Sequence, residues 1–463
     1  MKRFHLYEII EGTKGLLMSG KRDESFSGIS IDSRKIKKGE LFIAIKGEKF
    51  DGHSFISGSL KRGAKGVIYS EKIKTEKLIE SFPKSVFIEV NDTLKALQNI
   101  ALFYRRKFSV PLIGITGSNG KTTVKEMADS ILSRRFRTIK NPGNLNNHIG
   151  LPLSLLHLDK KHEIGIFELG MSRAGEIRKL CKIAVPTVGV VTNAGLAHAE
   201  NFKSIRDIAK AKAELIYSLP RNGVAVINGD DQNLVNAVRR FRGKKIFFGK
   251  GLDNDVRADE IDEKGLGIDF TLCIGRKRQR ISLPVIGEHN VYNALAASAC
   301  SYHFGVNRER IKKGLESYKG VHLRLEIIKT PGGINILNDS YNANPPSMTR
   351  ALDSFSKISA KGKKILLLGD MLELGKIATR CHREIGCIVA KGNYDFLFTV
   401  GRLAKTIAVS SVKEGMQKEN VKSFKNPKEV INPLKKMLSR GDWILVKGSR
   451  GMKLDEIVNE IRK

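Results

Sequence analysis

The sequence predicts an α/β protein of three domains, at residues 1–107, 108–320 and 321–463. Three observations support this fold class. The chain has 463 residues, and a compact domain typically holds about 150. Apolar strands alternate with amphipathic helices over residues 108–320, and the alternation recurs on a smaller scale over residues 321–463. Residues 1–107 hold short strands and turns, which indicate a smaller α/β unit.

Apolar runs place the strands of the first two domains. Residues 41–45 (LFIAI) and 66–69 (GVIY) predict strands in the first domain. Residues 112–116, 164–169 and 188–192 predict strands in the central domain, separated by helical segments. Strands that alternate with helices are typical of a doubly wound parallel sheet.

The third domain repeats this pattern. Residues 364–368 (KILLL), 396–400 (FLFTV) and 443–447 (WILVK) predict three buried strands, each followed by glycine. We therefore expect a second nucleotide-fold-like unit. Ligands favour the interface between two such domains and the carboxyl ends of their parallel strands, so we expect the site in the cleft between them.

Composition indicates a globular protein without a membrane segment. No apolar run approaches the roughly 18 residues of a membrane span. Residues 1–20 include two glutamates and lack the apolar region of a signal peptide. We expect a cytoplasmic protein, and we expect it to be a monomer. The five cysteines include no C-x-x-C pair, which predicts reduced, neutral thiols.

The net charge of +34 has three interpretations. It could serve nucleic-acid binding, attract a polyanionic small substrate, or reflect a general lysine bias. The basic residues are spread along the whole chain, with no dense block beyond residues 276–280. The sequence also lacks an aromatic-rich platform for single strands and a recognition-helix signature. We therefore expect no nucleic-acid partner.

The strongest motif is the glycine-rich segment at residues 114–123 (GITGSNGKTT). It follows a predicted strand and precedes an amphipathic helix, which is the context of a phosphate-binding loop. Backbone N–H groups and the helix N-terminus favour bound phosphate there. The loop is a shortened variant, because Ile115 stands where the general pattern has glycine. The residues expected to bind ATP are Gly117, Ser118, Asn119, Gly120, Lys121, Thr122 and Thr123.

Within this loop, the side chain of Lys121 can reach the β- and γ-phosphates, and Thr122 can ligate Mg²⁺. Glu168 ends an apolar strand, where a carboxylate needs a cationic partner. It is either a Mg²⁺ ligand or part of a structural ion pair. His198 lies in the loop after strand 188–192. A loop histidine is commonly a surface or capping residue, but this position also allows a metal-binding role.

Lys212 falls on the apolar face of a predicted helix that Ser204 is expected to cap. Ile208, Lys212 and Leu215 share that face, whereas Lys210 does not. One interpretation is a lysine whose stem covers apolar surface. The other is a desolvated lysine with a lowered pKa. Its neutral amine could react with CO₂ to form a carbamate, a carboxylate-like ligand for Mg²⁺.

Together these residues resemble the Mur ligase superfamily. The resemblance runs through the phosphate loop, Glu168, His198 and residues 211–214 (AKAE), and continues in residues 287–297 (GEHNVYNALAA). It covers nearly the whole chain. It implies an ATP-dependent ligase that activates a carboxylate as an acyl phosphate for attack by an amine. It also implies a UDP-binding first domain, a central P-loop ATPase-like domain and a Rossmann-like third domain.

The resemblance implies a catalytic set of Lys121, Lys212, His198 and Arg324, in which Lys212 is carbamylated. Thr122, Glu168, His198 and Lys212 would hold Mg²⁺. Arg324 would cross the cleft from the third domain to the γ-phosphate, so domain closure would complete the site.

The nucleotide side of the site is implied in the same way. Asn290 and Asn293 would lie at the adenine, although each could instead cap or line an ordinary helix. Asp339, also from the third domain, would meet the ribose.

Three segments resemble the branch of the family that adds a dipeptide: residues 141–152, 168–172 and 338–348 (NDSYNANPPSM). Relatives that add a single amino acid typically carry an Asp-Asn-Pro-Arg-type motif where this chain has NANP at residues 342–345. The implied substrates are ATP, D-alanyl-D-alanine and a UDP-N-acetylmuramoyl-tripeptide whose third residue is diaminopimelate or lysine. The implied substrate-binding residues are Ser33, Arg34, Asn144, Asn146, Asn342 and Asn344.

Several alternatives stay open at this point. Another amino acid-adding Mur ligase and folylpolyglutamate synthetase are the nearest enzymes, but the second would not be expected to carry a UDP-binding-like first domain. A basic, nucleic-acid-dependent P-loop ATPase is the alternative from a different class.

Overall fold

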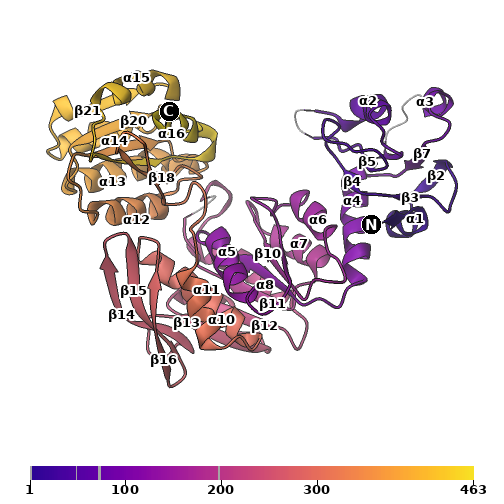
Figure 1. Ribbon diagram of the computed structural model, residues 1–463, viewed down its shortest axis with the longest axis horizontal. Coiled ribbons are helices and arrows are strands. Elements are labelled where there is room, and N and C mark those ends of the chain that lie inside the picture. Colours follow the sequence, from indigo (N-terminus) through magenta and orange to yellow (C-terminus); the bar gives the residue numbers. More distant parts are fainter. Residues whose placement is uncertain (1–2, 48–49, 71–74, 197–198, 463) are drawn as a thin grey trace.

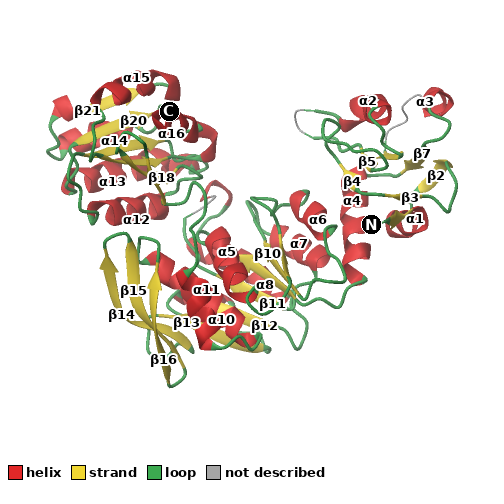
Figure 2. Cartoon of the chain, viewed as in Figure 1, coloured by secondary structure: helices red, strands yellow, loops and turns green. Residues whose placement is uncertain are grey.

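The computed structural model describes residues 3–47, 50–70, 75–196 and 199–462. It contains three α/β domains arranged as an open arch, with the first and third domains on opposite sides of the central one (Figure 1). Helices cover the faces of the sheets (Figure 2). In the described part of the chain, no helix is long and apolar enough to cross a membrane.

The first domain is a five-stranded sheet of order β2-β7-β6-β5-β4, beside a small pair of strands, β1 and β3. The sheet is parallel except for the edge strand β2, which pairs antiparallel with β7. Its elements are β1 (Phe4–His5), α1 (Leu6–Thr13), β2 (Leu16–Ser19), β3 (Ser25–Phe26), β4 (Ile29–Ser30), β5 (Leu41–Ile43), η1 (Gly52–Phe55), α2 (Ile56–Lys61), β6 (Gly66–Tyr69), α3 (Thr75–Ser81), β7 (Val86–Glu89) and α4 (Thr93–Arg106).

The central domain contains a nine-stranded sheet of order β16-β15-β14-β13-β12-β11-β8-β10-β9. Strands β8 to β14 pair in parallel, with helices on both faces, as the alternation of strands and helices predicts. Its elements are β8 (Leu112–Thr116), α5 (Lys121–Leu132), β9 (Thr138–Lys140), α6 (Gly150–Leu155), β10 (Ile164–Glu168), α7 (Glu176–Ala184), β11 (Val188–Val191), η2 (Ala199–Asn201), α8 (Ile205–Tyr217), β12 (Val224–Asn228), α9 (Gln232–Ala237), β13 (Lys244–Gly249), β14 (Val256–Lys264), β15 (Gly267–Ile274), β16 (Lys277–Leu283), α10 (His289–His303) and α11 (Arg308–Glu316).

Strands β14, β15 and β16 form an antiparallel extension of this sheet, which the parallel pattern did not predict. Two-residue loops connect the three strands, and each loop begins with a glycine at positive φ: Gly265 at 60° and Gly275 at 56°. Such loops reverse a chain directly and leave no room for a crossover helix. The alternation that indicates parallel strands is therefore missing here.

The third domain is a six-stranded sheet of order β17-β18-β22-β19-β20-β21, parallel except for the edge strand β17. The three strands predicted in this domain correspond to β19, β20 and β22. Its elements are β17 (Glu326–Lys329), β18 (Asn335–Asp339), α12 (Pro345–Ser356), β19 (Lys364–Gly369), η3 (Gly375–Ile377), α13 (Ala378–Lys391), β20 (Phe396–Val400), α14 (Lys405–Lys413), η4 (Lys418–Asn420), β21 (Val421–Phe424), α15 (Pro427–Met437), β22 (Trp443–Lys447), η5 (Arg450–Met452) and α16 (Asp455–Arg462).

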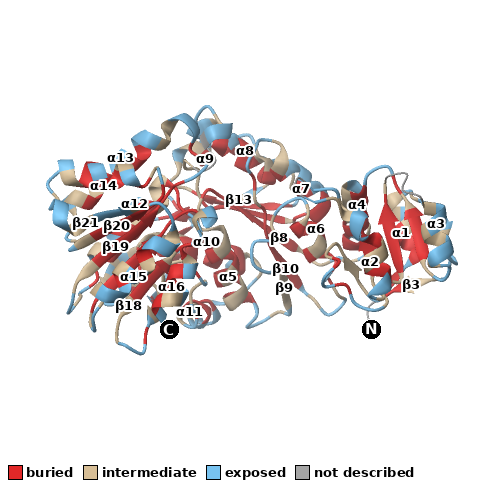
Figure 3. Ribbon diagram, turned by 90° about the horizontal axis from the view of Figure 1, so that it is seen from above, coloured by how far each residue is buried: buried red, intermediate tan, exposed pale blue. Residues whose placement is uncertain are grey.

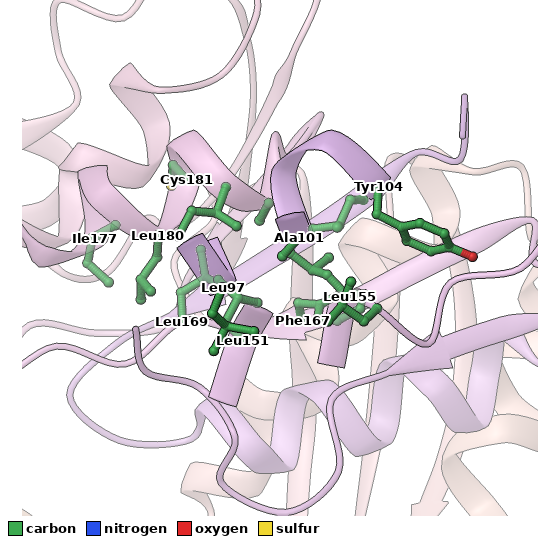
Figure 4. Close-up of a cluster of buried hydrophobic side chains, with 14 of the residues drawn as sticks. Leu97, Ala101, Tyr104, Leu151, Leu155, Phe167, Leu169, Ile177, Leu180 and Cys181 are labelled. Carbon is green, nitrogen blue, oxygen red and sulfur yellow. The ribbon is translucent and has the colours of Figure 1, made fainter. Parts of the chain in front are cut away.

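The first and central domains share one hydrophobic core. Helix α4 lays Leu97, Ala101 and Tyr104 against α6, α7 and strand β10 of the central domain (Figure 4). Arg105 of the same helix is buried and donates hydrogen bonds to the carbonyls of Ala184, Phe108 and Val110, at 2.9, 2.7 and 2.7 Å. A buried guanidinium with these partners fixes α4 in place.

Buried residues concentrate on the strands and on the inner faces of the helices (Figure 3). In the central sheet, α5, α10 and α11 pack on one face, and α6 to α9 pack on the other. The polar residues that carry chemistry follow the carboxyl ends of β8, β10 and β11. The carboxyl ends of β18, β19 and β22 contribute residues to the same cleft from the third domain.

Candidate active site

The glycine-rich loop joins β8 to α5, as predicted. At two of its positions neighbouring atoms leave no room for a side chain, so only glycine fits. Gly120 has φ 83°, and a Cβ there would lie 2.3 Å from Oδ1 of Asn293. A Cβ on Gly117 would lie 1.8 Å from Oγ1 of Thr192. Any side chain at either position would displace the loop from the residues that hold it.

Neighbouring strand ends hold the loop rigidly. Asn193 accepts from the amide of Asn119 at 3.0 Å and donates to its carbonyl at 3.1 Å, and Thr192 donates to that carbonyl at 2.6 Å. The hydroxyl of Ser118 bonds to both backbone groups of Gly195, at 2.8 and 2.9 Å. The sequence analysis did not assign a role to Thr192 or Asn193. Both directly follow β11, and the carboxyl end of a parallel strand is a common place for functional residues.

Lys121 begins α5, and its Nζ donates to the carbonyl of Gly117 at 2.8 Å. The ammonium therefore lies across the mouth of the loop. Burial lowers the pKa of Lys121; the nearby Glu168 opposes this shift, and Arg324 adds to it. An anion bound at the loop would relieve this unfavourable environment, as expected for a phosphate-binding lysine.

Glu168 lies opposite the first turn of α5 and is buried. Its Oε2 accepts from Oγ1 of Thr122 at 2.8 Å, and its Oε1 accepts from Nδ2 of Asn146 at 2.7 Å. These hard oxygen donors suit Mg²⁺. Among the described residues, no group of three or more acidic, histidine or cysteine side chains is arranged to hold a metal ion.

Lys125 is a buried residue that the sequence interpretation missed. Its Nζ donates to the carbonyls of Asn141 and Gly143, at 2.8 and 3.2 Å. The side chain of Asn141 bonds to both the amide and the carbonyl of Glu168, at 3.0 and 3.2 Å. Lys125 thus holds the loop that positions Glu168. Lys125 is completely buried on the apolar face of α5. A lysine among the apolar residues of this helix could have identified it from the sequence.

Lys212 points into the protein, as the helical pattern predicts, with 2% of its surface exposed. Ser204 caps α8 by accepting from the amide of Asp207, also as predicted, and Lys210 is exposed. No carboxylate of the described residues forms an ion pair with Lys212. Burial lowers its pKa well below the ordinary value, and Lys121 adds to this effect. The predicted metal ligand His198 lies outside the described residues.

The loop opens into a cleft of about 580 Å³ between the central and third domains. Arg324 reaches across from the third domain, with Nη2 at 3.3 Å from Oγ1 of Thr122. Its guanidinium stacks 4.2 Å from the ring centre of Tyr341. Asn344 donates to Oδ1 of Asn119 at 3.1 Å, and it also caps α12. The third domain therefore touches the phosphate loop directly.

The backbone around Arg324 is unusual. Leu323 and Leu325 both have positive φ, at 63° and 45°, a conformation that branched residues rarely adopt. The amide of Leu325 donates to Oδ1 of Asp339 at 3.2 Å. This paired strain turns the arginine side chain toward the cleft.

Asp339 lines the cleft and forms an ion pair with the buried Lys447, at 2.5 Å. Lys447 also donates to the carbonyl of Asn342 at 3.1 Å. Asn144 and Asn146 line the cleft from the central domain. The predicted contact of Asp339 with ribose stays a prediction.

A second cavity, of about 550 Å³, adjoins the far side of the loop. Asn293, His289 and Tyr292 from α10 line it, together with Asp230, which accepts from the hydroxyl of Tyr292 at 2.9 Å. The pKa of His289 is lowered to about 3 by burial and by nearby cations, so its ring is neutral at neutral pH. Asn290 lines the 580 Å³ cleft and accepts from Nδ2 of Asn293 at 2.9 Å. The predicted adenine contacts are therefore close to the loop.

Ser33 and Arg34 lie in the first domain, after β4, and line neither cavity. Arg34 is exposed and forms two bonds to Asp32, each of 2.9 Å. The structure thus brings together the phosphate loop, Glu168 and Arg324, and places the predicted UDP contacts in a separate domain.

Models of known protein families match most of the chain. Residues 25–105 match the Mur ligase family catalytic domain, residues 115–301 the Mur ligase middle domain, and residues 323–450 the Mur ligase glutamate ligase domain. With the phosphate loop and the arginine that faces it, these matches define an ATP-dependent, ADP-forming ligase.

A protein of Bacillus subtilis named UDP-N-acetylmuramoyl-tripeptide--D-alanyl-D-alanine ligase is 39% identical to the chain, over 98% of this chain and 97% of that protein. The chain belongs to the Mur ligase family. The crystal structure of MurF from Acinetobacter baumannii has a TM-score of 0.89 and 30% identity, covering 100% of this chain and 99% of that one. The MurF ligase of Thermotoga maritima, in complex with ADP, has a TM-score of 0.80 and 27% identity, covering 94% and 97%.

Proposed function

We propose that this chain adds D-alanyl-D-alanine to UDP-N-acetylmuramoyl-tripeptide in peptidoglycan precursor synthesis, with conversion of ATP to ADP and phosphate. The observation that carries the proposal is the cleft in which the phosphate loop and Glu168 meet third-domain residues, namely Arg324, Tyr341, Asn342 and Asn344. Full-length similarity to relatives of that name supports the choice of substrates.

The reaction runs in two steps. An oxygen of the tripeptide carboxylate attacks the γ-phosphorus, and the bond to the bridging oxygen of ADP breaks, which leaves an acyl phosphate. Lys121, the loop amides and Arg324 stabilise the charge on the phosphates and orient them for in-line attack. The neutral amine of the dipeptide then attacks the acyl carbon. The tetrahedral intermediate expels phosphate, and the nitrogen gives up a proton to form the amide.

Closure of the third domain over the cleft would exclude water from the acyl phosphate, which water would hydrolyse. Thr122, Glu168, His198 and a carbamylated Lys212 would hold Mg²⁺. When bound, Mg²⁺ would neutralise charge on the β- and γ-phosphates.

Further contacts complete the proposal. Asn290 and Asn293 would face the adenine, and Asp339 the ribose. The nucleotide of the tripeptide substrate would bind at Ser33 and Arg34. Substrate groups in the cleft would contact Asn144, Asn146, Asn342 and Asn344. We expect the enzyme to act as a monomer, and the nucleotide substrates support action in the cytoplasm.

The choice of amine tests the proposal. The enzyme is expected to prefer D-alanyl-D-alanine over free diaminopimelate or lysine by about a hundredfold or more, because a single amino acid would leave the carboxylate grip of a dipeptide pocket empty. The measurement is phosphate release with UDP-muramoyl tripeptide and with UDP-muramoyl dipeptide, each offered every amine. Efficient addition of a single amino acid to the dipeptide precursor would move the protein to a neighbouring branch of the family.

The high positive charge is not expected to bind nucleic acid. Even at the densest basic segment, Arg278 pairs with Asp259 and Glu260, at 3.4 and 2.9 Å, which reduces the free charge. Single-stranded and duplex DNA should therefore bind weakly at about 150 mM salt and should not stimulate ATP hydrolysis. Fluorescence anisotropy across a salt series measures this. Nanomolar affinity with a steep salt dependence would favour the nucleic-acid-dependent ATPase instead.

A further inference from the structure

A third cavity, of about 220 Å³, lies beside the ATP cleft in the third domain. Its wall is formed by the segments that follow three neighbouring strands: Tyr341–Asn344 after β18, Leu372–Leu374 after β19 and Ser449–Gly451 after β22. Ligands of parallel α/β sheets bind at such carboxyl ends. The position therefore indicates a binding site formed mainly by the third domain, with Asn144 of the central domain at its wall.

Ser449 joins these three segments. Its hydroxyl accepts from the amide of Leu372 at 2.9 Å and donates to the carbonyl of Ala343 at 3.3 Å, and its own amide donates to the carbonyl of Asp370 at 3.0 Å. Ser449 is buried, so these bonds are shielded from water. The wall of the cavity is consequently preorganised before any ligand enters.

Arg450 is the only cationic side chain among the described residues that line this cavity. An ion pair of 3.0 Å between its Nη1 and Oδ2 of Asp455 orients the guanidinium. The remaining N–H groups of the guanidinium can bind a carboxylate in a bidentate arrangement. The side chain is half-exposed, so a ligand can reach it.

The small cavity and the ATP cleft share part of their lining, namely Asn144, Tyr341, Asn342, Asn344 and Glu373. A molecule bound against Arg450 can therefore extend toward the phosphate loop. The lining of the small cavity also includes the apolar side chains of Leu372, Leu374 and Ala343. A short ligand with methyl side chains and an anionic end would match the apolar lining and the cationic Arg450.

We propose that Arg450 binds the terminal carboxylate of D-alanyl-D-alanine, with the amine end directed to the ATP cleft. This inference rests on the proposed function. The segment at residues 342–345 lacks an arginine, and Arg450 supplies one from the end of a different strand. A dipeptide places its carboxylate about 3.5 Å farther from its amine than a single amino acid does, which fits a grip located in the neighbouring cavity.

The test compares D-alanyl-D-alanine with D-alanyl-D-alaninamide, which lacks the carboxylate, in the wild-type enzyme and in Arg450→Met. The wild type is expected to use the acid about 100-fold better than the amide, as kcat/KM. Arg450→Met should lose about 100-fold with the acid and change less than about threefold with the amide, because the lost interaction needs both partners. Arg450→Lys should give an intermediate preference.

Two controls separate this role from a general effect on folding. Formation of the acyl phosphate from ATP and tripeptide without amine, trapped with hydroxylamine, should be unchanged in Arg450→Met. Arg380→Met removes a comparable arginine, paired with Glu384 at 2.8 Å in the same domain but lining no described cavity, and should keep the full acid preference. If Arg450→Met keeps that preference, the inference is wrong while the proposed function stands. If the wild type uses neither dipeptide form, both fail.

Discussion

Replacing Lys121 by alanine is expected to reduce ligation by at least about 1,000-fold while the protein stays folded. The side chain lies at the mouth of the phosphate loop, held by the carbonyl of Gly117. Removing its ammonium leaves the charge on the transferred phosphate unbalanced in a partly desolvated site, which typically costs several kcal/mol in the transition state. Steady-state phosphate release with saturating substrates measures the effect.

Stability provides the control for this variant. Burial and Arg324 lower the pKa of Lys121, so the charged side chain is unfavourable in the ATP-free protein at neutral pH. The alanine variant should therefore unfold at a temperature no lower than that of the wild type. Lys121→Arg keeps the charge but changes its geometry, and should recover little activity. Near-normal ligation by Lys121→Ala would show that another group binds the phosphates.

Replacing Lys212 by alanine is expected to reduce activity at least about 100-fold, because a metal ligand would be lost. Acetate or formate should restore part of the activity by supplying the missing carboxylate. The reason is structural: the lysine is 2% exposed, has a strongly lowered pKa and forms no ion pair with a described carboxylate. A neutral amine in that position is available to react with CO₂.

Matched variants make this test specific. Lys210→Ala changes an exposed lysine on the same helix and should have no effect. Lys212→Met keeps most of the buried volume, so a loss of activity in both Lys212 variants would not come from a cavity alone. High-resolution crystals grown with bicarbonate near neutral pH should show density beyond Nζ. A bare amine there, or a lack of rescue by small carboxylates, would exclude the carbamate.

Local patterns in the sequence were sufficient for a large part of the fold and the site. The alternation of apolar strands and helices predicted the parallel sheets of the second and third domains, and the strand, glycine turn and helix predicted the phosphate loop. The inward direction of Lys212 followed from helical spacing around Ser204 and Leu215. Each of these features depends on residues within one or two neighbouring elements, and such short-range constraints leave a regular pattern.

The contacts between distant parts of the chain were determined only by the tertiary structure. The bonds of Arg324 to Thr122 and of Asn344 to Asn119 join residues more than 200 positions apart. The antiparallel extension, β14 to β16, depends on pairing rather than on periodicity. Arg450 gained its proposed role only because β22 lies between β18 and β19 in the sheet. Strand order and domain packing are set by the burial of entire apolar faces of sheets and helices. The local sequence around a polar residue at a strand end therefore does not show which residue it will contact.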